Sequence, residues 1–170
     1  SLFSVNDTAN LRATLEKRGL LLDTTFDAID NIWTDRPALP GSPVFIHDVK
    51  FAGEKAADKI RKILAEATEQ GATSIFIPAL DEIAWVLNIR SRDVNCNPVA
   101  TSFLYLSPAG STLFIKEEKI DAATRAYLAD NGVAVAPYAS AYEFLAQLPD
   151  NARVLIEAIR TSGRTLDTLG

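Results

Sequence analysis

Two neighbouring segments of this chain are apolar on both sides of the strands that they predict. Residues 101–106 and 111–115 have the composition of strands, and residues 107–110 between them are typical of a hairpin turn. Successive side chains of a strand point to opposite faces, so Phe103 faces one side and Leu104 faces the other. A sheet that contains this hairpin must therefore be covered on both faces.

The strongest helical pattern of the chain is suited to cover one face. Apolar residues within Glu54–Gln70 recur at the spacing of one helix face, charged residues occupy the other side, and Gly71 is placed to end the helix. The apolar residues of this stripe are Ala56, Ala57, Ile60, Ile63, Leu64 and Ala67. The segment is therefore predicted to be an amphipathic helix.

The remaining elements after residue 43 alternate between strand and helix. Further strands are predicted at residues 44–46, 73–77, 133–136 and 154–156. Further helices are predicted after the acidic pair Asp81-Glu82, from the cap Asp121 to Asp130, and from a capping box that opens at Ser140. With one hairpin inside this alternation, the fold class is predicted to be α/β, with a mixed β-sheet flanked by helices.

The N-terminal part of the chain is separated from these elements by a proline-rich connector. A helix is predicted at residues 7–18 with Asn6 or Asp7 as its cap, followed by a short strand at residues 20–22. Residues 36–43 contain three prolines, which forbid a continuous helix or a central strand. We therefore expect residues 1–43 to form an arm and a stiff connector, and the main domain to begin at residue 44.

Composition excludes several classes of protein. The 170-residue chain has a net charge of −5 and no basic stripe, which argues against nucleic-acid binding. Its apolar runs are all shorter than the roughly 20 residues that span a bilayer, so no membrane partner is expected. Cys96 is the only cysteine, which rules out an internal disulfide and suits a reducing cytoplasm. The lack of methionine at position 1 indicates a piece of a longer protein, with a processed N-terminus as the alternative.

Few residues offer chemistry. His47, the only histidine, ends an apolar run, and we interpret it as a strand-end residue rather than a catalytic base. Cys96 has no basic neighbour that would lower the pKa of its thiol. One histidine and one cysteine cannot make a zinc site, and the acidic pairs at residues 81–82 and 117–118 are interpreted as helix starts or solvated faces. No catalytic and no metal-binding residue is therefore assigned.

Three stretches resemble the middle domain of cytosolic-type Xaa-Pro aminopeptidases. Residues 32–40 are similar to that family's Trp-x-Asp-Arg-Pro-x-Leu-Pro connector, and residues 51–59 to its Tyr-Ala-Gly-x-Ser-x-x-x-Lys stretch. The most specific stretch is Leu80–Arg90, followed by Asp93 and Asn97-Pro98-Val99. The chain departs from the family pattern after Arg90, where Ser-Arg replaces Gly-Ser, and at two positions of the following loop, which are Cys96 and Ala100.

The resemblance implies a creatinase/prolidase N-terminal-like domain with a ribonuclease H-like motif, spanning residues 44–160. Residues 161–170 would then start a linker to an absent pita-bread catalytic domain, in which Asp, Asp, His, Glu and Glu ligands hold two divalent ions, typically manganese. The implied parent is a cytoplasmic, metal-dependent peptidase that releases the N-terminal residue from peptides with proline second, and it is a candidate homodimer. This chain alone is expected to be inactive. Within the parent, it is expected to shape the cleft, next to the N-terminal and catalytic domains of the same polypeptide.

One loop is singled out as a candidate cleft-facing site, made of Arg90, Asp93 and Asn97. Arg90 and Asp93 are three residues apart, close enough to pair if the chain turns, and a guanidinium can bind a peptide carboxylate. The alternative is that this pair only braces its own loop. Two other functions stay open: a free-standing binding module of the same fold, and a small enzyme that uses Cys96 or the acidic residues.

Overall fold

The computed structural model describes residues 3–24, 29 and 32–170 and divides the chain into two compact units. One unit runs from Pro40 to Ile156, and the other combines the segment up to Leu39 with Glu157–Gly170. The predicted boundaries at residues 43/44 and 160/161 stay predictions. In the part of the chain that the structure describes, no helix is both long and apolar enough to span a bilayer.

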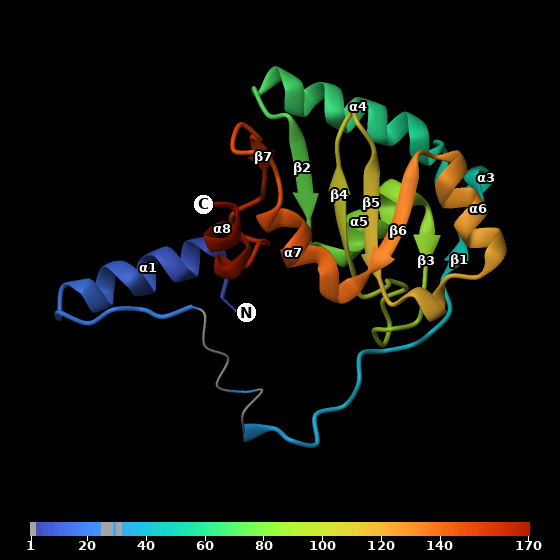
Figure 1. The fold of residues 1–170 in the computed structure, drawn as a ribbon. Coiled ribbons are helices and arrows are strands. Elements are labelled where there is room, and N and C mark those ends of the chain that lie inside the picture. The colour runs from blue at the N-terminus through green and yellow to red at the C-terminus, as the bar shows by residue number, and fades with distance from the viewer. Residues whose placement is uncertain (1–2, 25–28, 30–31) are drawn as a thin grey trace. The chain divides into compact units, whose positions relative to one another are not determined.

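A mixed five-stranded sheet forms the centre of the larger unit (Figure 1). Its strand order is β6-β5-β4-β2-β7, with antiparallel pairs in the middle and a parallel pair at each edge. The strands are β2 (Ser74–Ile77), β4 (Ser102–Leu106), β5 (Ser111–Ile115), β6 (Val133–Pro137) and β7 (Val154–Leu155). The predicted hairpin is confirmed, because β4 and β5 pair with Phe103 opposite Phe114 and Leu104 opposite Leu113.

The two faces of this sheet differ in chemistry. One face is aliphatic and belongs to the main core cluster, to which its strands contribute Ile75, Ile77, Leu104, Leu106, Leu113, Ile115 and Val133. The other face is aromatic, and its strands contribute Phe76, Phe103, Tyr105 and Phe114. The prediction that this hairpin is buried on both sides is therefore confirmed, since the period-2 alternation divides two kinds of side chain between two layers.

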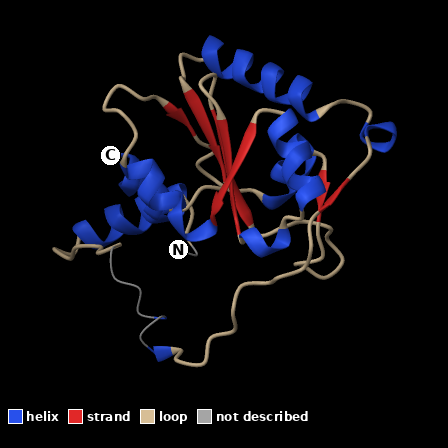
Figure 2. Cartoon of the chain, turned by 45° about the vertical axis from the view of Figure 1, so that its right-hand side comes forward, coloured by secondary structure: helices blue, strands red, loops and turns tan. Residues whose placement is uncertain are grey.

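Helices cover both faces (Figures 1 and 2). Residues of α4 (Ala56–Glu69), α5 (Leu80–Leu87) and α6 (Ala122–Asp130) pack in the aliphatic cluster. The aromatic face is covered by the 3₁₀ turn Tyr138–Ser140 and by α7 (Ala141–Ala146), whose Phe144 ring lies 4.9 Å from Tyr105 and 5.2 Å from Phe114. The larger unit therefore has three layers, helix, sheet and helix.

A small second sheet lies outside the main one. Strand β1 (Phe45–Ile46) pairs antiparallel with β3 (Ile89–Arg90), and the short helix α3 (Val49–Ala52) follows β1. The carboxylate of Asp48 caps α3 by accepting a hydrogen bond from the Lys50 amide at 2.9 Å. Gly53 ends α3 with φ of +79°, a left-handed conformation that glycine adopts without a steric penalty.

In the smaller unit, α1 (Val5–Glu16) packs on α8 (Gly163–Leu169). The two helices approach so closely that a Cβ atom on Gly163 would lie 2.2 Å from the Thr8 hydroxyl oxygen. Residues 161–170, predicted to start a linker, thus contain a helix that packs on the N-terminal arm. The predicted strand at residues 20–22 is wrong, because these described residues form no strand, and most of the stretch 24–33 lies outside the described residues.

Two helix starts also differ from expectation. Helix α1 begins two residues early because Ser4 is its cap, with Ser4 and Asp7 in a reciprocal capping box, so the prediction of Asn6 or Asp7 as the cap is wrong. The capping box predicted at Ser140 does not form either, since the Ser140 hydroxyl donates backwards to the Pro137 carbonyl at 2.7 Å. Helix α7 instead continues directly from a 3₁₀ turn, which already supplies hydrogen bonds at its start.

The predicted apolar stripe of α4 can be tested at Ile60, which is 8% exposed in the aliphatic core. Replacing Ile60 with Asp places an unpaired carboxylate in an apolar layer, so we expect a loss of more than about 3 kcal/mol in the free energy of unfolding. Urea denaturation of the 170-residue chain measures this loss.

Ala65→Asp is the matched control, because Ala65 is an exposed residue of the same helix. Its expected effect is within about 0.5 kcal/mol of zero. Equal losses for the two variants would show that Ile60 and Ala65 are not on different faces of α4.

Candidate functional site

The predicted loop follows β3 and leads into β4, and its three candidate residues have different environments. Arg90 is half-buried, the Asp93 side chain is fully buried, and Asn97 is exposed. A narrow turn brings Val94 opposite Asn97, and Cys96 at its tip is exposed with φ of +61°. The structure therefore places Arg90 at the end of β3 and Asp93 and Asn97 in the loop that follows, with the Asp93 side chain turned inward.

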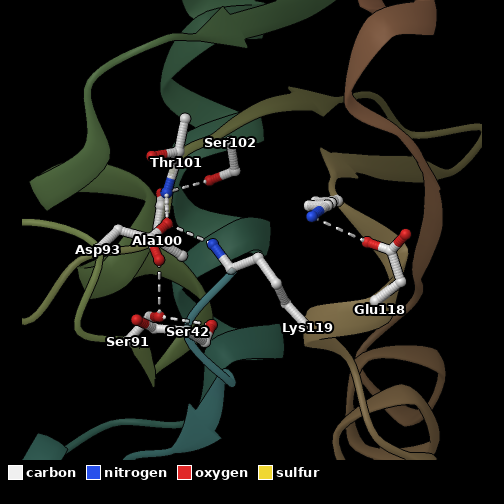
Figure 3. Close-up of polar contacts among 9 residues, drawn as sticks. Ser42, Ser91, Asp93, Ala100, Thr101, Ser102, Glu118 and Lys119 are labelled. Carbon is white, nitrogen blue, oxygen red and sulfur yellow. Dashed lines mark hydrogen bonds and ion pairs between the residues drawn. The ribbon is translucent and has the colours of Figure 1, made fainter. Parts of the chain in front are cut away.

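Asp93 forms the buried anchor of the loop (Figure 3). Its carboxylate pairs with the ammonium of Lys119, and the two side chains are 0% and 1% exposed. The backbone amide of Thr101 donates to the same carboxylate at 2.7 Å. The Ser91 hydroxyl lies 3.4 Å from the second carboxylate oxygen and donates to the Ser42 carbonyl at 3.0 Å. The anchor thus joins the loop to the start of β4, to residue 119 and to the end of the proline-rich connector.

The surroundings of Asp93 favour its charged form. Burial alone would raise the pKa of Asp93, but hydrogen bonds from Lys119 and from the Thr101 amide outweigh burial, and the net shift of the pKa is downward. A carboxylate with a depressed pKa stabilises the folded state above its unfolded pKa, and this contribution is lost as the pH falls through the folded pKa. The ion pair is therefore in place at neutral pH.

The three-residue spacing of Arg90 and Asp93 allowed an ion pair between them, but the contacts of the Arg90 side chain are with other groups. Its Nη1 atom instead donates to the carbonyl of Ala84 at 2.6 Å and to that of Ile89 at 2.8 Å. Ala84 belongs to the last turn of α5, and its carbonyl also accepts a hydrogen bond from the Asn88 amide that caps the helix. The guanidinium thus acts at the negative end of the helix dipole. It braces the end of α5, and the alternative that an Arg90–Asp93 pair braces the loop is not what the contacts of Arg90 show.

Two further side chains satisfy carbonyls at the same helix end. Lys59 of α4 donates from Nζ to the Trp85 carbonyl at 2.8 Å, and the Tyr127 hydroxyl of α6 donates to the Leu87 carbonyl at 3.1 Å. Burial raises the pKa of Tyr127, which keeps its hydroxyl proton available for donation. Residues from three different elements therefore meet at the C-terminal end of α5.

Lys59 and Asn88 form a second polar cluster, which we name the Lys59–Asn88 brace. Asn88 ends α5 with φ of +52°, a left-handed conformation that asparagine tolerates better than most residues. Its side chain accepts from Lys59 Nζ at 2.7 Å and donates to the Glu54 carbonyl at 2.7 Å. Burial lowers the pKa of Lys59, an effect that the Glu54 carboxylate opposes and Arg90 reinforces. The ammonium also lies 4.4 Å from the centre of the Trp85 ring.

A pocket of about 460 Å³ opens beside this brace. Its lining comes from the β1–α3 segment, the start of α4, the end of α5 and the end of α6. The lining residues are Ile46, His47, Asp48, Val49, Lys55, Ala56, Asn88, Tyr127 and Asn131. His47 is half-buried here, and its ring stacks on Phe51 with centroids 5.9 Å apart, as suits a residue at the end of a strand.

The acidic pairs do not assemble a metal centre. Asp81 and Glu82 lie in the first turn of α5, which confirms them as a helix start, while Glu117 and Glu118 face Arg125 and Lys116 at 3.5 Å. Over residues 3–24, 29 and 32–170, no group of three or more His, Cys, Asp or Glu side chains could hold a metal ion. These residues therefore do not fit a metal-activated hydroxide, and we derive no chemical step from them.

Sequence reasoning missed Lys59, Asn88 and Lys119. Position 59 lies three residues after Ala56 and four before Ile63, on the face that forms the apolar stripe, so a lysine there was a signal of a buried partner. Asn88 stands between the apolar residues Leu87 and Ile89. Lys119 follows the acidic pair at residues 117–118, and nothing in the local pattern distinguishes it from half-buried Lys116 on the other side of that pair.

The chain matches the family model described as the creatinase/prolidase N-terminal domain over residues 35–169. It is 36% identical over 145 residues to a protein named probable Xaa-Pro aminopeptidase P from Ajellomyces capsulatus, and 31% identical over 180 aligned positions to one of the same name from Coprinopsis cinerea. These alignments cover 84% and 99% of the chain. The chain is thus similar to these relatives along most of its length.

A solved structure gives the same result. The X-prolyl aminopeptidase of Caenorhabditis elegans, described as a cytosolic enzyme with a di-nuclear active site, superposes with a TM-score of 0.89 and 26% identity over 99% of the chain. The chain covers only 29% of that protein, and 23% and 29% of the two fungal relatives. It therefore corresponds to about a quarter of each of these longer proteins.

The Asp93–Lys119 pair provides a test of the loop anchor. Replacing Asp93 with Ala leaves the Lys119 ammonium buried without its carboxylate, so we expect a loss of about 3–5 kcal/mol in the free energy of unfolding at pH 7. The double variant Asp93→Ala/Lys119→Met removes the orphaned charge and should lose less than the sum of the two single changes. Urea denaturation of all four proteins measures the coupling.

The pH dependence gives an internal check. Because the pKa of Asp93 is depressed in the folded state, the gap in stability between the natural chain and Asp93→Ala should narrow as the pH falls below about 4. Asp58→Ala, which removes a pair with exposed Arg61, should cost less than about 1 kcal/mol. If Asp93→Ala costs no more than this control, the buried anchor is not what holds the loop.

Proposed function

We propose that this chain, which belongs to the creatinase/prolidase N-terminal domain family, serves as a non-catalytic middle domain of an Xaa-Pro aminopeptidase. The observation that carries this proposal is the superposition of 99% of the chain on 29% of the Caenorhabditis elegans enzyme. A domain matched so completely, within a protein more than three times as long, is suited to supporting chemistry that other parts of the polypeptide perform.

The parent protein, in this proposal, is a cytoplasmic metallopeptidase that releases the N-terminal residue from peptides with proline second. Its two divalent ions, with manganese as the proposed metal, bind outside this chain. The di-nuclear site of the Caenorhabditis elegans enzyme supports two metals in the parent, and the donor set of the described residues does not fit them. A homodimeric parent belongs to the same proposal.

The contribution of this domain would be architectural. The loop from Arg90 to Asn97 would face the peptidase cleft, where it would limit access by large substrates. Asp93 supports this role because its buried pair with Lys119 holds the inner side of the loop in place. Asn97 is exposed and lies at the surface. Arg90 fixes the start of the loop on the last turn of α5.

Activity measurements test the proposal directly. The 170-residue chain should not cleave a peptide with proline second, with or without Mn²⁺, because its described residues hold no ligand set for the metal. The full-length polypeptide should cleave it in a reaction that a chelator stops and Mn²⁺ restores.

Release of the first residue is the quantity to measure, and a peptide with alanine second is the control substrate. Turnover by the pure 170-residue chain would contradict its non-catalytic role. A reading frame that stops soon after Gly170 would instead support a free-standing binding module.

A further inference from the structure

Four large apolar side chains are left exposed on the β1–α3 segment. Phe45, Ile46, Val49 and Phe51 are 47%, 38%, 44% and 70% exposed, and all four lie within seven consecutive residues. We name these four residues the β1–α3 surface. Single exposed apolar residues are ordinary, whereas a segment of seven residues that exposes four of them beside a pocket is a candidate for contact with another surface.

The pocket beside the brace lies next to this surface. Ile46 and Val49 belong both to the β1–α3 surface and to the lining of the pocket of about 460 Å³. Asn88 and Tyr127 also line the pocket, and their polar groups are already engaged at the end of α5. An incoming surface therefore meets a hollow in which Ile46, Val49 and Ala56 stand among polar side chains, and such a hollow can receive a projecting side chain of a partner.

The segment is held firmly in place despite its exposure. The His47 amide donates to the Asn88 carbonyl at 2.7 Å, and the Val44 amide donates to the Lys119 carbonyl at 2.9 Å. Downstream, the Glu54 carbonyl accepts from the Asn88 side chain. The segment is thus fixed at both ends to the loop anchor and to the Lys59–Asn88 brace. Such a preformed surface loses little conformational entropy when it binds.

We propose that the β1–α3 surface and its pocket are the docking site for the catalytic part of the same polypeptide. This inference rests on the proposed function and names the contact through which the middle domain would support the peptidase. The relatives supply enough chain to cover the surface, since this domain is only 23–29% of their length. The surface is also continuous with the proposed cleft-facing loop, because β1 pairs with β3 and Phe45 lies opposite Arg90.

Site-specific photo-crosslinking in the full-length polypeptide tests the docking site. A benzophenone amino acid placed at position 51 should form crosslinks within one polypeptide to residues that follow Gly170. The same probe at position 65, on the exposed side of α4, is the control and should give several-fold less of this product. Mass spectrometry of the crosslinked peptides identifies the contact.

Hydrogen exchange gives a second measurement that needs no substitution. Amides of residues 45–52 should exchange several-fold more slowly in the full-length polypeptide than in the 170-residue chain. The variant Val49→Ser/Phe51→Ser should lose this protection in the full-length polypeptide and leave the melting temperature of the 170-residue chain unchanged. Equal exchange in both proteins, together with no crosslink above the position-65 control, would overturn the inference.

The remaining outcomes separate this inference from the function on which it rests. Crosslinks only between two copies, or only to residues before Ser1, would assign the surface to a different occupant and would overturn the inference while leaving peptidase activity unaffected. A full-length polypeptide without metal-dependent peptidase activity would refute the proposed function even if the crosslinks form. A reading frame that ends near Gly170 would refute both.

Discussion

The unpaired carbonyl groups at the C-terminal end of α5 set the arrangement of the larger unit. A helix that ends inside a domain must satisfy these groups there, because water cannot. Here Lys59 of α4 and Tyr127 of α6 each donate to one of them, and Arg90 of β3 is a second donor to the Ala84 carbonyl, which also accepts from the Asn88 amide. Since each donor comes from a different element, satisfying a single helix end fixes the positions of its neighbours in the aliphatic layer.

Two lysines are buried with different partners. In both cases the contacts of the ammonium group fix the positions of neighbouring elements more than they add to the stability of the fold. Lys119 meets the carboxylate of Asp93, whereas Lys59 meets a carbonyl, an amide oxygen and the Trp85 ring. A buried ion pair adds little net stability over a well-packed apolar pair, but its directional bonds favour one arrangement over others. In this domain the segment around β1 is hydrogen-bonded to one residue of each cluster, since the Val44 amide donates to the Lys119 carbonyl and the His47 amide to the Asn88 carbonyl.

The sequence predicted the sheet layers better than the polar clusters, for a physical reason. The hairpin around Phe103 and Leu104 and the stripe around Ile60 repeat at the period of a strand or a helix, so their burial can be deduced from neighbouring residues. The partner of Asp93 is 26 residues away, and only tertiary structure shows that Lys119, rather than Arg90, is in reach. The failed capping box at Ser140 has a similar origin, because the preceding 3₁₀ turn uses the hydroxyl that the motif would require.

The placement of these clusters bears on how a domain without reactive groups can influence a reaction. A surface can orient a neighbouring domain only if it does not yield when that domain moves, and apolar packing alone allows side chains to change rotamer. The β1–α3 segment is held by backbone hydrogen bonds to Asn88 and Lys119, two residues whose side chains are themselves bound in buried polar clusters. Exposed apolar side chains on a segment that is held in this way can bind a partner domain and also fix its orientation. A domain that shapes a cleft without contributing reactive groups needs both properties.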